Sequence, residues 1–181
     1  MTHPFALDVD TLSGMKPLST AVFAMGSNLG DRLEQLDSAV ASLRATPDVI
    51  IVDVSPVYET AAVGGPAGSP DFLNIVVVTE TTQPPRVLLE RAHAIEDAHG
   101  RTRAEVNGPR TLDVDLIVVG RAVVESDQVQ IPHPRAHERA FVLAPWADID
   151  RDAEIPGHGK VADLLAEVDT RGITRRDDLV L

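Results

Sequence analysis

The order in which two apolar patterns alternate along the chain constrains its fold more than any other feature. Short runs rich in β-branched residues predict strands, whereas apolar residues recurring every three or four positions predict amphipathic helices. The elements expected, in chain order, are strand 20–25, helix 30–45, strand 49–54, strand 72–80, a helix from Pro84-Pro85 to Gly100, and a strand within 108–120. This β-α-β-β-α-β order predicts an α+β, ferredoxin-like sandwich in which two helices cover one face of a sheet.

Segments on either side of this core are expected to be additions to it. Residues 1–17 show no sustained period, so we interpret them as a loose arm, either disordered or packed across a neighbouring molecule or its own domain. Beyond residue 120 the pattern weakens into C-terminal additions: a strand-like piece, a turn, a short helix, and another short helix near 160–167. The length of 181 residues suits one domain, which we place at 18–181.

The composition argues against several classes of protein. Hydrophobic residues make up 44% of the chain and charged residues 24%, which is typical of a globular protein. A net charge of −12 argues against nucleic acid and anionic membranes as partners. The chain has no cysteine, and it shows neither a signal-peptide pattern nor an apolar run of membrane-spanning length. We therefore expect a soluble, cytoplasmic protein. We also expect a monomer, although composition does not bear on the oligomeric state.

The segment GPRTLDVDLIVVG, residues 108–120, carries two aspartates one residue apart on an expected strand. Alternation along a strand places Asp113 and Asp115 on one face and their apolar neighbours on the other. Two like charges side by side need compensation. Solvent or arginine can supply it, and so can Mg²⁺, which takes one or two carboxylates and completes its shell with water and phosphate oxygens. The spacing alone leaves both interpretations open.

Arginines cluster just before these aspartates, although the chain as a whole is acidic. Arg101, Arg103 and Arg110 fall within ten residues, and guanidinium groups bind phosphate in a bidentate manner. A run of arginines alone is more often a solvated face, but beside paired aspartates it favours a nucleotide–Mg²⁺ site. The chain contains neither a Walker-type GxxxxGKS/T sequence nor a kinase glycine-rich loop, so such a site would belong to neither class.

Two of the six aromatic residues lie in polar surroundings, Phe72 in PDFLN and Phe141 in ERAFV. Both can be core residues, or they can be the two plates of a sandwich around a flat heterocycle whose edge meets Asn74. His133 lies between two prolines, where it can bind phosphate or cap a turn. The residues themselves do not decide between these alternatives.

Several segments resemble, in order, motifs of the 6-hydroxymethyl-7,8-dihydropterin pyrophosphokinase family. They are MGSNLGDR, YET, PDFLN, IEDAHGRTR, GPRTLDVDLI and IPHPRAHERAFVLAPW. The resemblance covers residues 20–150 and implies transfer of a pyrophosphoryl group from ATP to the pterin alcohol, giving AMP and the pterin diphosphate, in tetrahydrofolate biosynthesis. The sequence departs from the family pattern at Asn107, where many members have tryptophan, and at Ala61 and Ala62, where prolines are common.

The resemblance also implies roles for individual residues. Asp113 and Asp115 would hold two Mg²⁺ ions against the ATP phosphates and act in catalysis with Arg101 and Arg103. The implied ATP-binding residues are His93, Glu96, Arg103, Arg110, Leu116, Gln130, His133 and Arg139. The implied pterin-binding residues are Thr60, Ala61, Val63, Phe72, Asn74, Asp113 and Phe141. The stretch 101–109 has little apolar surface to bury, so we expect a loop that is mobile in the free enzyme and orders over ATP and pterin.

Two other functions fit parts of the pattern. A metal-dependent phosphatase or nucleotidyltransferase could use the same aspartate pair, and it would release free phosphate or form a nucleotidyl adduct in place of AMP. A ferredoxin-like RNA-binding module would display aromatics on its central strands and a basic face. The expected strands here are aliphatic and the net charge is −12, which argues against the RNA-binding module.

Overall fold

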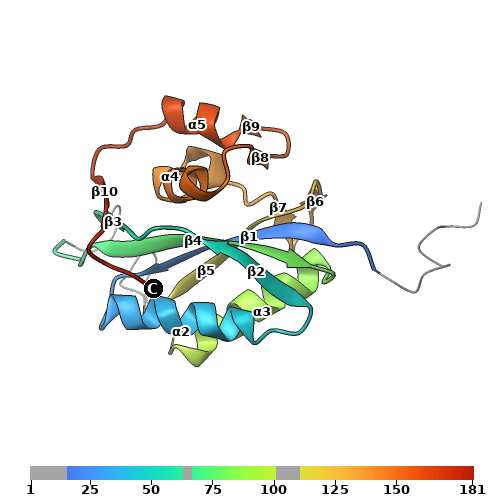
Figure 1. Ribbon diagram of the computed structural model, residues 1–181, viewed down its shortest axis with the longest axis horizontal. Coiled ribbons are helices and arrows are strands. Elements are labelled where there is room, and N and C mark those ends of the chain that lie inside the picture. Colours follow the sequence, from blue (N-terminus) through green and yellow to red (C-terminus); the bar gives the residue numbers. More distant parts are fainter. Residues whose placement is uncertain (1–15, 63–66, 101–110) are drawn as a thin grey trace, which may run out of the picture.

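The computed structural model describes residues 16–62, 67–100 and 111–181 (Figure 1). The expected order of the main elements is confirmed: β1 (Ser19–Ser27), α2 (Arg32–Arg44), β2 (Val49–Val54), β4 (Phe72–Thr81), α3 (Pro85–Ala98) and β5 (Asp113–Val119). Local signals fix the helix starts. The Asp31 carboxylate caps α2 by accepting a hydrogen bond from the Glu34 amide at 3.1 Å, and α3 begins at a proline.

Six of the described strands form one antiparallel sheet, and the four other short strands form two separate two-stranded pairs. The four long strands of the six-stranded sheet lie in the order β5-β1-β4-β2, and two short strands that sequence reasoning missed extend it. β3 (Tyr58–Thr60) pairs with the first residues of β4, and β10 (Ile173–Arg175), near the end of the chain, pairs with β3. The expectation of a mixed fold of helices and strands is therefore confirmed, with a larger sheet than the sequence pattern indicated.

Helices cover both faces of this sheet (Figure 1). One buried core joins the lower face to α2 and α3, as expected. A second core joins the upper face to α4 (Ala140–Ile149) and α5 (Val161–Glu167), the two short helices expected among the C-terminal additions. The end of β5 that carries the aspartates lies under the start of α4. Arg139, the N-cap of α4, contacts Asp115 there.

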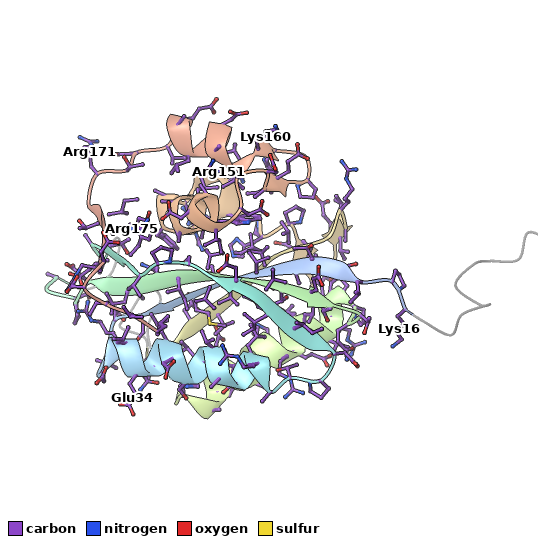
Figure 2. All side chains as sticks on the ribbon, in the orientation of Figure 1. Lys16, Glu34, Arg151, Lys160, Arg171 and Arg175 are labelled. Carbon is purple, nitrogen blue, oxygen red and sulfur yellow. The ribbon has the colours of Figure 1, made fainter. Side chains whose placement is uncertain are left out.

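Short elements connect these layers. They are β6 (Val124–Glu125), β7 (Gln130–Ile131), the 3₁₀ turn η1 (Ala136–Glu138), β8 (Glu154–Ile155) and β9 (Gly159–Lys160). Figure 2 shows labelled charged side chains, among them Glu34 and Arg171, at the outside of the molecule. No helix in the described part of the chain is long and apolar enough to span a bilayer.

Candidate active site

The aspartate pair lies on β5 as the alternation predicts. Leu112 and Val114 are buried in the core against α2 and α3, whereas Asp113 and Asp115 are half-buried on the opposite face, toward α4. The two carboxylates therefore share one face of an edge strand, close to the start of a helix. This placement concentrates negative charge at a single position on the sheet.

Gly26 of β1 lies between the aspartate strand and β4. In the registers of the sheet it pairs with Asp113 on one side and with Asn74 of β4 on the other. A Cβ atom at Gly26 would lie 2.7 Å from Asn74 Oδ1, far inside normal contact distance. The absence of a side chain thus leaves the space above Gly26 to the Asn74 amide. Sequence reasoning assigned no role to Gly26, although it begins the GSN of a family motif.

Two basic side chains approach Asp115 from the segment before α4. Arg139 Nη1 lies 3.4 Å from Asp115 Oδ2, and its guanidinium carbon lies 5.6 Å from the centre of the Phe141 ring. His133 Nε2 lies 3.9 Å from the same carboxylate oxygen. Two predicted phosphate-binding residues and one predicted stacking residue therefore meet beside the predicted metal ligand.

His133 is neutral at physiological pH in this arrangement. Burial, followed by the nearby positive charge of Arg139, lowers the pKa of His133 to about 4. Its Nδ1 accepts a hydrogen bond from the Arg135 amide at 3.2 Å, so the neutral ring carries its proton on Nε2. The contact with Asp115 is therefore not an ion pair, and His133 offers an N–H donor toward the site.

The predicted pterin residues gather on β3, β4 and α4. Asn74, which is buried, donates from Nδ2 to Thr60 Oγ1 at 2.8 Å. Phe72 and Phe141 are each partly exposed, as a surface that stacks on a ligand requires. The Thr60 bond fixes the Asn74 amide, whose oxygen then lies over Gly26. A hydrogen-bonding edge and two aromatic rings thus come from the same face as the aspartates.

The other predicted nucleotide-binding residues differ in burial, and therefore in which of their atoms a ligand can contact. Glu96 is buried on α3, and its Oε1 accepts the Val114 amide at 2.8 Å, so it also fixes β5. Leu116 has its side chain in the core, which leaves only its backbone for a ligand. His93 and Gln130 are exposed. The predictions at Val63, Arg101, Arg103 and Arg110 lie outside the described residues.

The donor set can be compared with the needs of a metal ion. Within the described ranges 16–62, 67–100 and 111–181, no group of three or more His, Asp or Glu side chains could hold a metal. The two aspartates alone match Mg²⁺, which takes one or two carboxylates and leaves its other positions to water and phosphate. Two hollows, of about 420 and 490 Å³, adjoin Gly120 and Arg121 at the other end of β5. None of the predicted site residues lines either hollow.

Comparison with known proteins gives this geometry a context. The model of the 7,8-dihydro-6-hydroxymethylpterin-pyrophosphokinase (HPPK) family matches residues 22–151. The chain belongs to this family. It is 44% identical to the 2-amino-4-hydroxy-6-hydroxymethyldihydropteridine pyrophosphokinase of Bacillus subtilis over 74% of this chain and 80% of that protein. It is 39% identical to the protein of the same name from Methylorubrum extorquens over 87% of this chain and 99% of that one.

The fold agrees with that of solved HPPK structures. A crystal structure of the Plasmodium falciparum HPPK-DHPS superposes with a TM-score of 0.67 at 13% identity, over 87% of this chain and 47% of that one. The family match of this HPPK covers most of β1 and all of β2 to β5, α2, α3 and α4. β8, β9, α5 and β10 lie beyond the matched residues, yet β10 is part of the same sheet.

Proposed function

We propose that this HPPK transfers the pyrophosphoryl group of ATP to the hydroxyl group of 6-hydroxymethyl-7,8-dihydropterin, giving AMP and the pterin diphosphate. Family membership supports the reaction. The observation that carries it is the row Asp113–Gly26–Asn74 across β5, β1 and β4. This row sets carboxylates suited to a metal–phosphate group beside an amide suited to the edge of a heterocycle.

The neutral half of the site suits a pterin ring. With Nδ2 bonded to Thr60, Asn74 keeps its Oδ1 available as an acceptor for the N–H groups of a pterin edge. Phe72 and Phe141 would stack on the ring faces, and Ala61 borders the same strand end. Such a site recognises a flat molecule by shape and by one hydrogen-bonding edge.

The charged half suits the phosphates of ATP. Asp113 and Asp115 would hold Mg²⁺, which supplies positive charge that neutralises the phosphoryl oxygens. Arg139 is only loosely paired with Asp115, at 3.4 Å, so its guanidinium can turn to a phosphate. His133 would donate its Nε2–H to a phosphoryl oxygen. Arg101, Arg103 and Arg110 are proposed to bind the same phosphates.

Catalysis would then rest on positioning and electrostatics. The pterin hydroxyl attacks the β-phosphorus in line with the departing AMP, the hydroxyl proton is released, and no covalent intermediate with the protein is needed. Because the aspartates of β5 and Asn74 of β4 lie on one face of the sheet, the two substrates would meet across Gly26. Glu96, which holds the Val114 amide, and the exposed His93 and Gln130 would complete the nucleotide side.

A product assay tests this function directly. Purified protein with ATP, Mg²⁺ and the pterin alcohol should give AMP and pterin diphosphate in equal amounts. Free phosphate, or a nucleotidyl adduct, as the main product would contradict the proposal in favour of the phosphatase or nucleotidyltransferase. We further propose a ferredoxin-like core, a single domain over 18–181 with an arm at 1–17, and a monomeric, cytoplasmic enzyme that binds neither nucleic acid nor membranes.

A further inference from the structure

Two backbone positions fix the predicted pterin residues in space. Thr60 ends β3 and Phe72 begins β4, and the two pair with each other in the sheet. The chain leaves the sheet after Thr60 and returns at Phe72. The residue directly before each of these two therefore helps to decide where the Thr60 and Phe72 side chains lie. Those residues are Glu59 on one side and Asp71 on the other.

Glu59 is held by arginines from two distant parts of the chain. Its Oε2 lies 2.7 Å from Arg176 Nη1 and 3.3 Å from Arg32 Nη1. The Glu59 side chain is only 24% exposed, so these contacts are partly shielded from water. Two charge-assisted contacts on one oxygen make Glu59 a junction between β3, the start of α2 and the end of the chain.

Arg32 links the same junction to the other backbone position. Its Nη1 donates to the Asp71 carbonyl oxygen at 2.8 Å, directly before Phe72. Asn28, at the end of β1, donates from Nδ2 to the Pro70 carbonyl at 3.2 Å. One connected set of contacts therefore holds the chain on both sides of the Thr60–Phe72 pair.

Residues 172–178, which we name the C-terminal strap, complete this set of contacts. The strap lies after residue 151, where the family match ends. The strap adds β10 to β3, and the Ala61 amide donates to the Gly172 carbonyl at 3.3 Å. The Arg176 amide donates to the Val57 carbonyl at 2.8 Å. Asp178 accepts two hydrogen bonds from the Arg176 guanidinium, at 2.8 and 2.7 Å, and so orients it toward Glu59. The strap thus contacts the backbone on both sides of Glu59.

We propose that Arg176 is a positioning residue that, through Glu59, sets the affinity of this enzyme for the pterin and not for ATP. Side chains alternate along β3, so a shift at Glu59 moves Thr60 on the other face, where it accepts from Asn74. The aspartates lie on β5, three strands beyond β3, whereas the strap pairs with β3 on the other side of the sheet. The inference rests on the proposed function.

The test compares steady-state kinetics of two matched variants in the same tail. Arg176→Gln removes the contact with Glu59, and Arg171→Gln removes the exposed pair between Arg171 and Asp169, which contacts only the tail itself. Arg176→Gln should raise the KM for pterin by about threefold to thirtyfold, with the KM for ATP and kcat within about twofold of wild type. Arg171→Gln should change none of the three. If Arg176→Gln does not fold, Arg176→Lys is measured instead. This variant keeps the positive charge but loses the bidentate guanidinium, and it should raise the KM for pterin in the same direction.

A double-mutant cycle decides whether the effect passes through Glu59. In a Glu59→Gln background, Arg176→Gln should add no further increase in the KM for pterin. Equal pterin KM values for wild type and Arg176→Gln would overturn the inference, as would equal losses for ATP and pterin. Wild-type protein that forms no pterin diphosphate would instead contradict the proposed function, so the two failures are distinguishable.

Discussion

β5 and β3, at opposite sides of the sheet, hold their candidate site residues by different means. β5 presents two charges whose position follows from strand alternation over three residues, with Arg139 and His133 beside them. β3 presents neutral groups whose position depends on Arg32, Arg176 and Asp148, which lie up to 117 residues away. The two carboxylates are thus placed by their own strand, whereas the position of the β3 residues depends on contacts with distant parts of the chain.

The largest effect is expected on β5. Asp113→Ala and Asp115→Ala should each abolish turnover while the fold stays intact, because losing a metal ligand costs several kcal/mol of transition-state stabilisation, on the order of a thousandfold in rate. Turnover is measured with saturating ATP and pterin, and folding by circular dichroism. Asp127→Ala, at an exposed carboxylate in the β6–β7 turn, is the matched control and should remain active. Near-wild-type turnover in either site variant would remove the metal assignment.

A substitution at the boundary between the two halves should act on the pterin side. Gly26→Ala places a Cβ 2.7 Å from Asn74 Oδ1 and 3.6 Å from a Phe72 ring carbon. The Asn74 amide or the Phe72 ring would have to shift, so kcat/KM for pterin should fall by about tenfold to a hundredfold, which corresponds to about 1.4–2.7 kcal/mol of transition-state stabilisation. The same substitution in an Asn74→Ala background should cost less. An equal cost in both backgrounds would mean that Asn74 is not the group displaced.

The main sheet and its helices could be predicted from the sequence because each depends on its own residues. A run of β-branched residues was sufficient for β2, which lies at the expected 49–54, and three- to four-residue spacing was sufficient for α2. β3 and β10 have three residues each and no period of their own. β3 pairs with 72–74 of β4, and β10 in turn pairs with 58–60 of β3; neither pairing leaves a local signal.

The candidate site divides in the same way. Strand alternation predicted the shared face of Asp113 and Asp115, and the structure confirms it. Phe72, Asn74, His133 and Phe141 had two open interpretations each, and only the family resemblance favoured the binding role. Gly26 and Glu59 received no role, although both lie in quoted motifs, because a missing Cβ and an ion pair become visible only when distant strands are placed together.

A smaller, ligand-selective effect is expected at Phe141. Phe141→Ala should raise the dissociation constant for pterin by about twofold to tenfold and leave ATP binding nearly unchanged, since stacking contributes to one ligand only. Calorimetric titration with each ligand, ATP as a non-hydrolysable analogue with Mg²⁺, measures both. Ile149→Ala, which trims the same helix and core at its other end, is the control for packing. Equal losses for the two ligands would identify Phe141 as a core residue alone.

The smallest effect concerns the tie between β3 and α4, and it can be read from a single chromophore. Tyr58, the one tyrosine of the chain, donates to Asp148 Oδ2 at 2.6 Å. Burial, followed by this hydrogen bond, raises the pKa of Tyr58 from 10.0 to about 12. Because the folded state holds the phenolic proton more tightly, this stabilisation is complete below pH 10 and is lost as pH rises toward 12.

Titration of phenolate absorbance should therefore show a midpoint near 12 in the folded protein and near 10 in urea. The wild type should lose about 1 kcal/mol more stability than Tyr58→Phe over this range, a figure reduced for screening by solvent. Urea midpoints of both proteins at several pH values measure the difference, and Tyr58→Phe corrects for the lysines that titrate in the same range. A folded-state midpoint near 10 would mean that the Tyr58–Asp148 contact does not tie β3 to α4 in solution.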